Sequence, residues 1–325
     1  MSYTAPTITF LASGTPGLSG TPVGYASYTD LTILSSNSSA FSPSGPQIDA
    51  WCLDRNVTLL AGALAANGFY RANLYSTAAA ELDILNTAMP LLAGGLAGLK
   101  QLDSVNWLLN SYYKGTLGSI GIWQNVQGAV WALVGQDSSA TGQLIDGNQN
   151  AITFLTTQAL KPVADGGGDG YVADQGQTQY VGIVADPRLV ADVAIPLPLQ
   201  TGQPLIIPVL AARLGDFVWL DANNNGLQDN NEMGVNGVTV TLFRDLNNSG
   251  SYDAGDLLLG TKQTGPNGYY EFNGLTPGLC LPGAVHAAQR LRLHHPQCQC
   301  QWQRHHRQRC QHRHWRCPTG HAGAG

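Results

Sequence analysis

Two twelve-residue segments rich in Asp, Asn and Gly, at 221–232 and 245–256, stand between short runs of alternating apolar residues. Alternation of this kind predicts half-buried strands, and it is present at 216–219, 237–243 and 269–272. Short strands separated by polar turns are typical of a β-sandwich. The two segments therefore predict where strands end in a small all-β module.

The first segment fits the twelve-residue calcium loop at every place, including Gly226 at place six, where the chain must turn sharply. Calcium binds oxygen ligands, and alternate residues of such a loop point inward at the cation. Both segments offer oxygen donors at corresponding places. The expected ligands are Asp221, Asn223, Asn225, the Leu227 carbonyl, Asp229 and Glu232 in the first loop, and Asp245, Asn247, Ser249, the Ser251 carbonyl, Asp253 and Asp256 in the second.

The two loops differ at their last place. The Asp256 side chain is shorter than that of Glu232, so we expect weaker calcium binding in the second loop. The alternative is that Asp, Asn and Gly only form polar turns between strands. Two such loops in tandem favour Ca²⁺ as a cofactor.

This stretch resembles the B domain of serine-aspartate-repeat adhesins. The resemblance rests on Leu214-Gly-Asp-Phe-Val-Trp-Leu-Asp, Gly237-Val-Thr-Val-Thr-Leu and Gly268-Tyr-Tyr-Glu-Phe-Asn-Gly-Leu-Thr-Pro-Gly. It implies an immunoglobulin-like sandwich of the Cna-B or SdrD B-like type at 211–278, stiffened by calcium and serving as a stalk. Members of that family continue with another strand after the Pro-Gly.

The composition changes abruptly near residue 279. All eight histidines lie beyond it, in a tail that contains Arg but no Asp, Glu or Lys. Its Cys and His residues suggest zinc, but they lack the apolar core of a zinc finger. Arg304–Arg313, written as CGA CAC CAC CGA CAG CGA TGC CAA CAC CGC, reads Asp-Thr-Thr-Asp-Ser-Asp-Ala-Asn-Thr-Ala one base later. We therefore expect a frameshift near Gly278 and a disordered tail at 279–325.

Residues 1–195 predict an α+β head domain. Alternating residues at 7–11 and 28–34 predict strands, and apolar residues at helical spacing predict helices at 103–113 and 123–134. The proline-rich stretch 196–210 predicts a semi-rigid linker or an edge strand, with the domain boundary at its end.

Two short motifs of the head resemble those of the thioester domain of Gram-positive surface adhesins. They are Ala50-Trp-Cys-Leu-Asp and Val126-Gln-Gly-Ala-Val-Trp. The resemblance implies that the Cys52 sulfur attacks the Gln127 carboxamide, releases ammonia and leaves an internal thioester. Amines on a surface protein or polysaccharide would then open it and become covalently attached. The family often has Thr where Val126 stands, and Gln124 is a rival glutamine on the same helix.

The residues of this helix can also be interpreted without the family. Gln127, Val130, Trp131 and Val134 share one face, so the glutamine stands among apolar side chains. Burying a primary amide there is costly unless it is bonded, and a link to Cys52 would account for it. The alternative is a free, buried cysteine, with Gln127 hydrogen-bonded to backbone.

The charge pattern limits the function. Residues 1–278 contain all 21 acidic residues, and this negative charge disfavours nucleic acid as a partner. They contain no histidine, so a Ser-His or Cys-His catalytic arrangement is not available there. We expect a non-enzymatic protein, secreted or displayed on a bacterial cell surface, whose native signal and anchor are absent here, with no membrane span. The predicted function is covalent adhesion. The alternative is a structural envelope or matrix protein with calcium-binding stalk modules.

Overall fold

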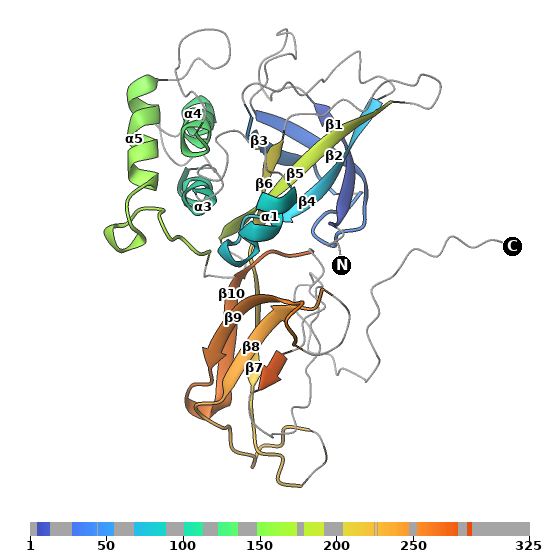
Figure 1. Ribbon diagram of the computed structural model, residues 1–325, viewed down its shortest axis with the longest axis vertical. Helices are drawn as coiled ribbons and strands as arrows, with labels where there is room; N and C mark the ends of the chain where they lie inside the picture. The colour runs from blue at the N-terminus through green and yellow to red at the C-terminus, as the bar shows by residue number, and fades with distance from the viewer. Residues whose placement is uncertain are drawn as a thin grey trace, which may run out of the picture.

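The computed structural model describes residues 5–13, 28–43, 45–54, 68–88, 101–112, 123–135, 148–173, 179–191, 204–223, 225, 227–246, 252–278 and 285–287. The fold is mostly β, with a few helices. Figure 1 shows two stacked bodies: a β-barrel with helices beside it, and a smaller set of strands below. The upper body, residues 5–210, is called the head, and the lower one, residues 212–287, the module.

Six antiparallel strands form the barrel of the head. They are β1 (Thr7–Ser13), β2 (Tyr28–Ser36), β3 (Ile48–Cys52), β4 (Gly68–Ser76), β5 (Tyr180–Ala191) and β6 (Leu205–Leu210). Their order is β1-β2-β3-β6-β5-β4, and β1 also pairs with β4, which closes the barrel. Closure removes the exposed sheet edges that an open sheet would present.

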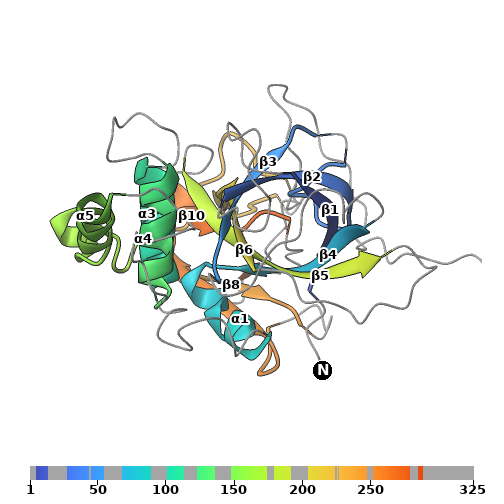
Figure 2. The ribbon, with the colours of Figure 1, turned by 90° about the horizontal axis from the view of Figure 1, so that it is seen from above.

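Helices cover part of the barrel. They are η3 (Ala79–Glu81), α1 (Leu82–Ala88), α3 (Leu102–Tyr112), α4 (Trp123–Leu133), α5 (Gln149–Ala159) and η4 (Val163–Asp165). In Figure 2, α3, α4 and α5 lie together on one side of the barrel. The helices predicted at 103–113 and 123–134 are confirmed by α3 and α4. No helix in the described ranges is both long and apolar enough to cross a membrane.

The head has two apolar layers because successive residues of a strand point to opposite faces. On β3, Ala50 and Cys52 pack in the cluster that fills the barrel with Phe10 and Leu31. The intervening Trp51 packs in the other cluster, between the barrel and helices α3 to α5. The motif around Cys52 is therefore buried on both faces.

The module consists of two small antiparallel sheets. Its elements are β7 (Ala212–Phe217), β8 (Thr239–Arg244), β9 (Leu257–Gln263), η5 (Pro266–Gly268), β10 (Tyr269–Leu275) and β11 (Val285–Ala287). One sheet pairs β10 with β7, and the other has the order β11-β8-β9. Val240 and Leu242 of β8 and Tyr270 and Phe272 of β10 fill the space between them.

The structure corrects two predicted boundaries. Leu205–Leu210, placed in the linker, is instead strand β6 between β3 and β5, because its alternate apolar side chains complete the barrel interior. Residues 196–203 of that linker lie outside the described ranges. In the tail, expected to be disordered, Val285–Ala287 forms β11, whose backbone pairs with the free edge of β8. The rest of the tail is not described.

An Asn-Gly pair is typical of a tight hairpin turn, and Asn267-Gly268 does form a turn, with positive φ at both residues (63° and 78°). It does not form a hairpin, however. The strands before and after it, β9 and β10, belong to different sheets, so the turn carries the chain from one sheet to the other.

Candidate functional site

Cys52 is the last residue of β3, is fully buried, and forms no disulfide with another described residue. On one side β3 pairs with β6, where Cys52 stands opposite Leu205. On the other side the described pairing with β2 ends one residue earlier, at Trp51 opposite Tyr28. Cys52 thus lies one residue beyond the described pairing with β2, and its backbone groups on that side must also be satisfied.

Helix α4 supplies their partner. The Cys52 N–H donates to Gln127 Oε1 (3.0 Å), and Gln127 Nε2 donates to the Cys52 carbonyl oxygen (2.8 Å). These two bonds fix the amide orientation, since the oxygen must face the donor and the nitrogen the acceptor. Gln127 is fully buried, so its carboxamide lies beside the backbone of the residue that carries the thiol.

Burial decides the ionisation of the thiol. It raises the pKa of Cys52 far above its ordinary value because the thiolate would be desolvated. The thiol is therefore neutral at physiological pH and is not an activated nucleophile in the sense of a protease cysteine. Any reaction at Cys52 must move the thiol proton as the sulfur attacks.

The same amide-to-strand pairing occurs a second time in the head. Asn110 of α3 donates to the Tyr180 carbonyl and accepts from the Tyr180 N–H, both at 2.7 Å, at the start of β5. No nucleophile of the cysteine type stands at that position. The pairing alone is therefore a way of capping a strand from a helix, and the thiol is what distinguishes the Gln127 site.

Loop one of the module follows a regular hydrogen-bond pattern. Asp229 Oδ2 accepts from the side-chain amides of Asn223 (2.7 Å) and Asn225 (2.8 Å), so places three, five and nine meet at one point. The Asn225 N–H donates to Asp221 Oδ1 (3.2 Å), which brings place one to the same side. The Leu227 N–H donates to Asn225 Oδ1 (2.7 Å).

The last residue of loop one closes it. Glu232 Oε1 accepts from the Ala222 N–H (2.9 Å), and Oε2 accepts from the Asp229 N–H (3.1 Å). One carboxylate thus joins places two and nine of the loop.

Loop two closes in the same way although its last residue is shorter. Asp256 Oδ1 accepts from the Leu246 N–H (3.1 Å), and Oδ2 accepts from the Asp253 N–H (2.9 Å). These are again places two and nine. Asp245, at place one, is nearly buried. The predicted ligands Asn247, Ser249 and Ser251 lie outside the described residues.

In the described ranges, no three His, Cys, Asp or Glu side chains are grouped as a metal site. In loop one, two asparagine side chains converge on Asp229 through their amide nitrogens, and asparagine is not among those residue types. Carboxylate, amide and carbonyl oxygens together are the donor set of calcium rather than of zinc. By residue type, loop one offers the mixed oxygen donors that a hard cation prefers, but both asparagines present their amide nitrogens to Asp229.

One pair of carboxylates was missed in the sequence. Asp30 of β2 and Asp49 of β3 stand opposite each other across the strand pair. Desolvation, then a hydrogen bond with Asp49 and its charge, raise the pKa of Asp30 to about 6. Strand alternation could have placed both on the outer face of the barrel, but the register that pairs them is not visible in the sequence.

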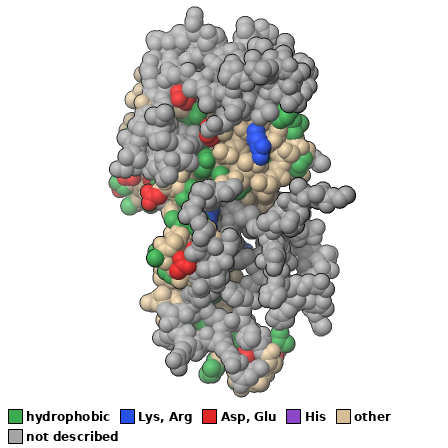
Figure 3. Space-filling view, turned by 45° about the vertical axis from the view of Figure 1, so that its right-hand side comes forward, with side chains coloured by type: hydrophobic (Ala, Val, Ile, Leu, Met, Phe, Trp, Pro, Cys, Tyr) green, Lys and Arg blue, Asp and Glu red, His purple; other side chains and the backbone are tan. Residues whose placement is uncertain are grey.

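On the face in Figure 3, charged side chains of described residues stand singly rather than in one patch.

Comparison with known proteins identifies the module. Residues 212–281 match the family model described as "SdrD B-like domain", which confirms the predicted resemblance of this part. No solved structure matches the chain.

Several curated relatives carry similar sequence. Serine-aspartate repeat-containing protein D of Staphylococcus aureus (strain Newman) is 29% identical over 172 residues, which is 52% of this chain and 12% of the relative. Serine-aspartate repeat-containing protein F of Staphylococcus epidermidis is 46% identical over 65 residues, 20% of this chain and 3% of the relative. Colossin-B of Dictyostelium discoideum is 43% identical over 65 residues, 20% of this chain and 2% of the relative. The matches thus span a small part of each relative.

Proposed function

We propose that this chain is part of a secreted, cell-surface adhesin whose head attaches covalently to amines through a thioester between Cys52 and Gln127. The observation that carries the proposal is the buried pairing of the Gln127 carboxamide with the backbone of Cys52. Similarity of the module to staphylococcal serine-aspartate repeat proteins supports the surface location. The partners would be amines of a surface protein or polysaccharide.

The chemistry follows from the two side chains. The Cys52 sulfur attacks the Gln127 carboxamide carbon, the carbon–nitrogen bond breaks, and the thiol proton leaves with the nitrogen as ammonia. The Cys52 N–H that donates to Oε1 would stabilise negative charge on that oxygen during the attack. An amine that later attacks the same carbon forms an amide and returns the proton to the sulfur.

Burial would protect the thioester from hydrolysis. Both residues are fully excluded from solvent, so water is kept from the acyl carbon. The neutral thiol is also consistent with a reaction in which sulfur and proton move together. The residues around the pair, Ala50 on the strand and Trp131 on the helix, belong to the apolar cluster inside the barrel.

For the module we propose calcium binding in both loops, which would stiffen it as a stalk. Asp221, Asn223, Asn225, the Leu227 carbonyl, Asp229 and Glu232 would hold the ion in loop one. A bound cation would offset the mutual repulsion of the loop carboxylates and replace the hydrogen bonds that now close the loop. Asp245, Asp253 and Asp256, with Asn247, Ser249 and Ser251, would serve loop two.

A second function, a structural envelope or matrix protein without covalent chemistry, is favoured by one observation. Asn110 pairs with Tyr180 as Gln127 pairs with Cys52, although no cysteine stands at that position. In this case Gln127 would be a strand cap, and Cys52 a small apolar residue of the barrel.

Intact-mass spectrometry of the freshly purified chain separates the two. A thioester makes the mass short by one ammonia. Methylamine opens the bond and adds its own mass, after which Cys52 can be alkylated. Both Cys52→Ala and Gln127→Ala should abolish the deficit.

Matched controls are available on helices α3 and α4. Asn110→Ala removes the equivalent cap, and Gln124→Ala removes the rival glutamine, so both should keep the deficit. A deficit that survives Gln127→Ala rejects the assignment to Gln127. Full mass in protein purified at mildly acidic pH, together with no uptake of methylamine, leaves the structural function.

A further inference from the structure

Head and module meet with no spacer between them. Strand β6 ends at Leu210 and β7 begins at Ala212, so a single residue, Ala211, connects the two bodies. Ala211 is 3% exposed, and its N–H donates to the Gln179 carbonyl of the head (2.8 Å). A linker of one buried, hydrogen-bonded residue has little freedom to act as a hinge.

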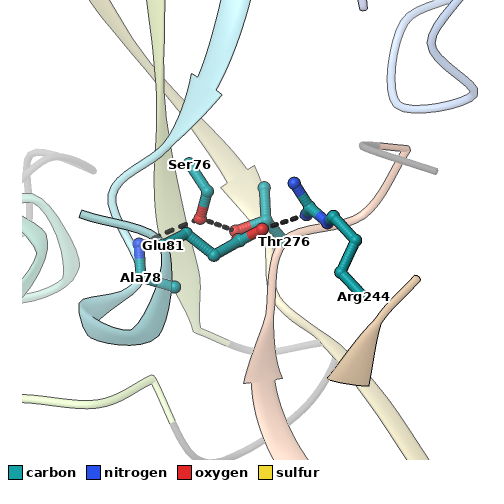
Figure 4. Close-up of polar contacts among 5 residues, drawn as sticks. All are labelled: Ser76, Ala78, Glu81, Arg244 and Thr276. Carbon is teal, nitrogen blue, oxygen red and sulfur yellow. Dashed lines mark hydrogen bonds and ion pairs between the residues drawn. The ribbon is translucent and has the colours of Figure 1, made fainter. Parts of the chain in front are cut away.

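A buried ion pair crosses the same boundary. Glu81 of η3 contacts Arg244, the last residue of β8, and their side chains are only 5% and 3% exposed (Figure 4). Two charges so completely removed from water are tolerated only while they neutralise each other. Separating the bodies would leave each charge either rehydrated at the cost of the packing around it or buried alone.

Two further polar contacts flank the ion pair. The hydroxyls of Ser76 in the head and Thr276 in the module lie 2.5 Å apart and are buried, and Ser76 Oγ also accepts from the Ala78 N–H (Figure 4). The Ser38 hydroxyl donates to the Gly278 carbonyl oxygen (2.8 Å), again buried. Each contact joins the head to the segment that follows β10.

Backbone contacts complete the boundary. Gly274 and Gly278 of the module have positive φ, 68° and 69°. A Cβ at Gly274 would lie 2.7 Å from the Ala173 carbonyl oxygen, and one at Gly278 would lie 2.3 Å from the Ala40 nitrogen. Both are closer than real side chains approach, so the module backbone lies directly on the head.

We propose that head and module form one rigid unit that unfolds cooperatively, with the Glu81–Arg244 pair fixing the module's orientation on the head. The module is then part of the head's own structure, and not an independently moving segment. This inference depends neither on the thioester nor on calcium.

If the proposed attachment at Cys52 is also right, the joint has a mechanical use. Cys52 stands opposite Leu205 on β6, and β6 continues through Ala211 into β7. A pulling force on the attached head would pass along these two strands into the module, through a boundary that does not bend.

Differential scanning calorimetry of the full chain tests the joint. In the wild-type chain, the head and the module should unfold together in one transition. Glu81→Gln and Arg244→Met should each split it, with the module melting roughly 10 °C or more below the head. Glu81→Leu with Arg244→Met, which leaves no unpaired charge, should restore a single transition. The control is Arg213→Met, which breaks the exposed ion pair with Glu271 inside the module and should leave one transition.

Hydrogen exchange gives a readout on the opposite side of the boundary. Arg244→Met, a change in the module, should speed amide exchange in residues 76–82 of the head about tenfold, whereas Arg213→Met should not. Two transitions in wild type overturn the proposal. The proposal is also overturned if the amide exchange rate of residues 76–82 changes in neither Arg244→Met nor Glu81→Gln.

Discussion

A covalent bond between Cys52 and Gln127 would have a measurable effect on the free energy of unfolding. The two residues are 75 positions apart in the chain. A cross-link across a loop of that length reduces the entropy of the unfolded chain and stabilises the fold by about 4 kcal/mol, if it behaves as a disulfide does. Without the bond, the pair contributes only hydrogen bonds and packing.

A double-mutant cycle isolates this contribution. The two hydrogen bonds of Gln127 use the backbone of residue 52, which Cys52→Ala leaves intact. Without a thioester, Cys52→Ala costs about 1 kcal/mol of packing, and Gln127→Leu costs about 2–4 kcal/mol for two unsatisfied backbone groups. Because Cys52→Ala leaves both hydrogen bonds in place, any coupling between the two losses should stay within the roughly 0.5–3 kcal/mol that neighbouring residues show.

With the thioester, either substitution alone removes the cross-link, so the double variant loses it only once. The cycle should then show a coupling energy of about 4 kcal/mol. Urea unfolding followed by tryptophan fluorescence measures it, since Trp51 and Trp131 are both buried in the head. The mass is checked again after refolding to show that the bond survived. A coupling energy near zero in protein that retains the ammonia deficit would refute the chain-entropy reasoning.

Three further predictions concern the rest of the molecule. Calcium should raise the melting temperature of the wild-type chain by mass action, and Glu232→Ala should reduce that rise in a calorimetric titration against chelator. Desolvation, and then Asp49, raise the pKa of Asp30 from 3.8 to about 6 in the folded protein. The contribution of Asp30 to stability is therefore fully present below pH 3.8, the pKa in the unfolded chain, and is lost as the pH rises through 6. Asp30→Asn should therefore flatten stability between pH 4 and 6 and raise it at pH 7 by about 1 kcal/mol or less, because solvent screens this partly exposed pair. Gly268→Ala should destabilise the module by more than about 2 kcal/mol in urea, since its Cβ would meet the Val218 carbonyl at 2.0 Å, whereas Gly265→Ala should be nearly neutral.

The local elements could be predicted where one periodicity dominates. The helical spacing of apolar residues gave α3 and α4 within a residue or two, and alternation gave β1, β2, β8 and β10. Helix α5 has a weaker pattern, and its start depends on Asn148, whose side chain accepts from the Ala151 N–H. Such a cap is easily confused with a loop residue when only the sequence is known.

The barrel could not be predicted because its closure depends on one misassigned segment. Leu205-Ile-Ile-Pro-Val-Leu210 is apolar but contains a proline and follows a proline-rich stretch, which suggests a linker. Proline is tolerated here because alternate residues of β6 direct their N–H to β5, as Ala211 does, so position 208 faces the β3 side, where the described pairing ends at Ile206. Only the register of both neighbouring strands reveals this.

For the candidate site too, the motifs identified the residues involved, whereas the contacts between them depend on the fold. The motifs singled out Cys52 and Gln127, and the alternation of β3 explains why the sulfur points into the barrel. The alternative interpretation, a Gln127 hydrogen-bonded to backbone, matches the bonds that the structure shows. The identity of that backbone, Cys52 itself, was not visible, because it depends on α4 crossing β3 where the described pairing with β2 ends. The thioester and the strand cap therefore both require that the Gln127 side chain be buried and lie against the end of β3. The two differ in the chemical fate of one nitrogen atom, which the thioester releases as ammonia and the strand cap keeps in the Gln127 side chain.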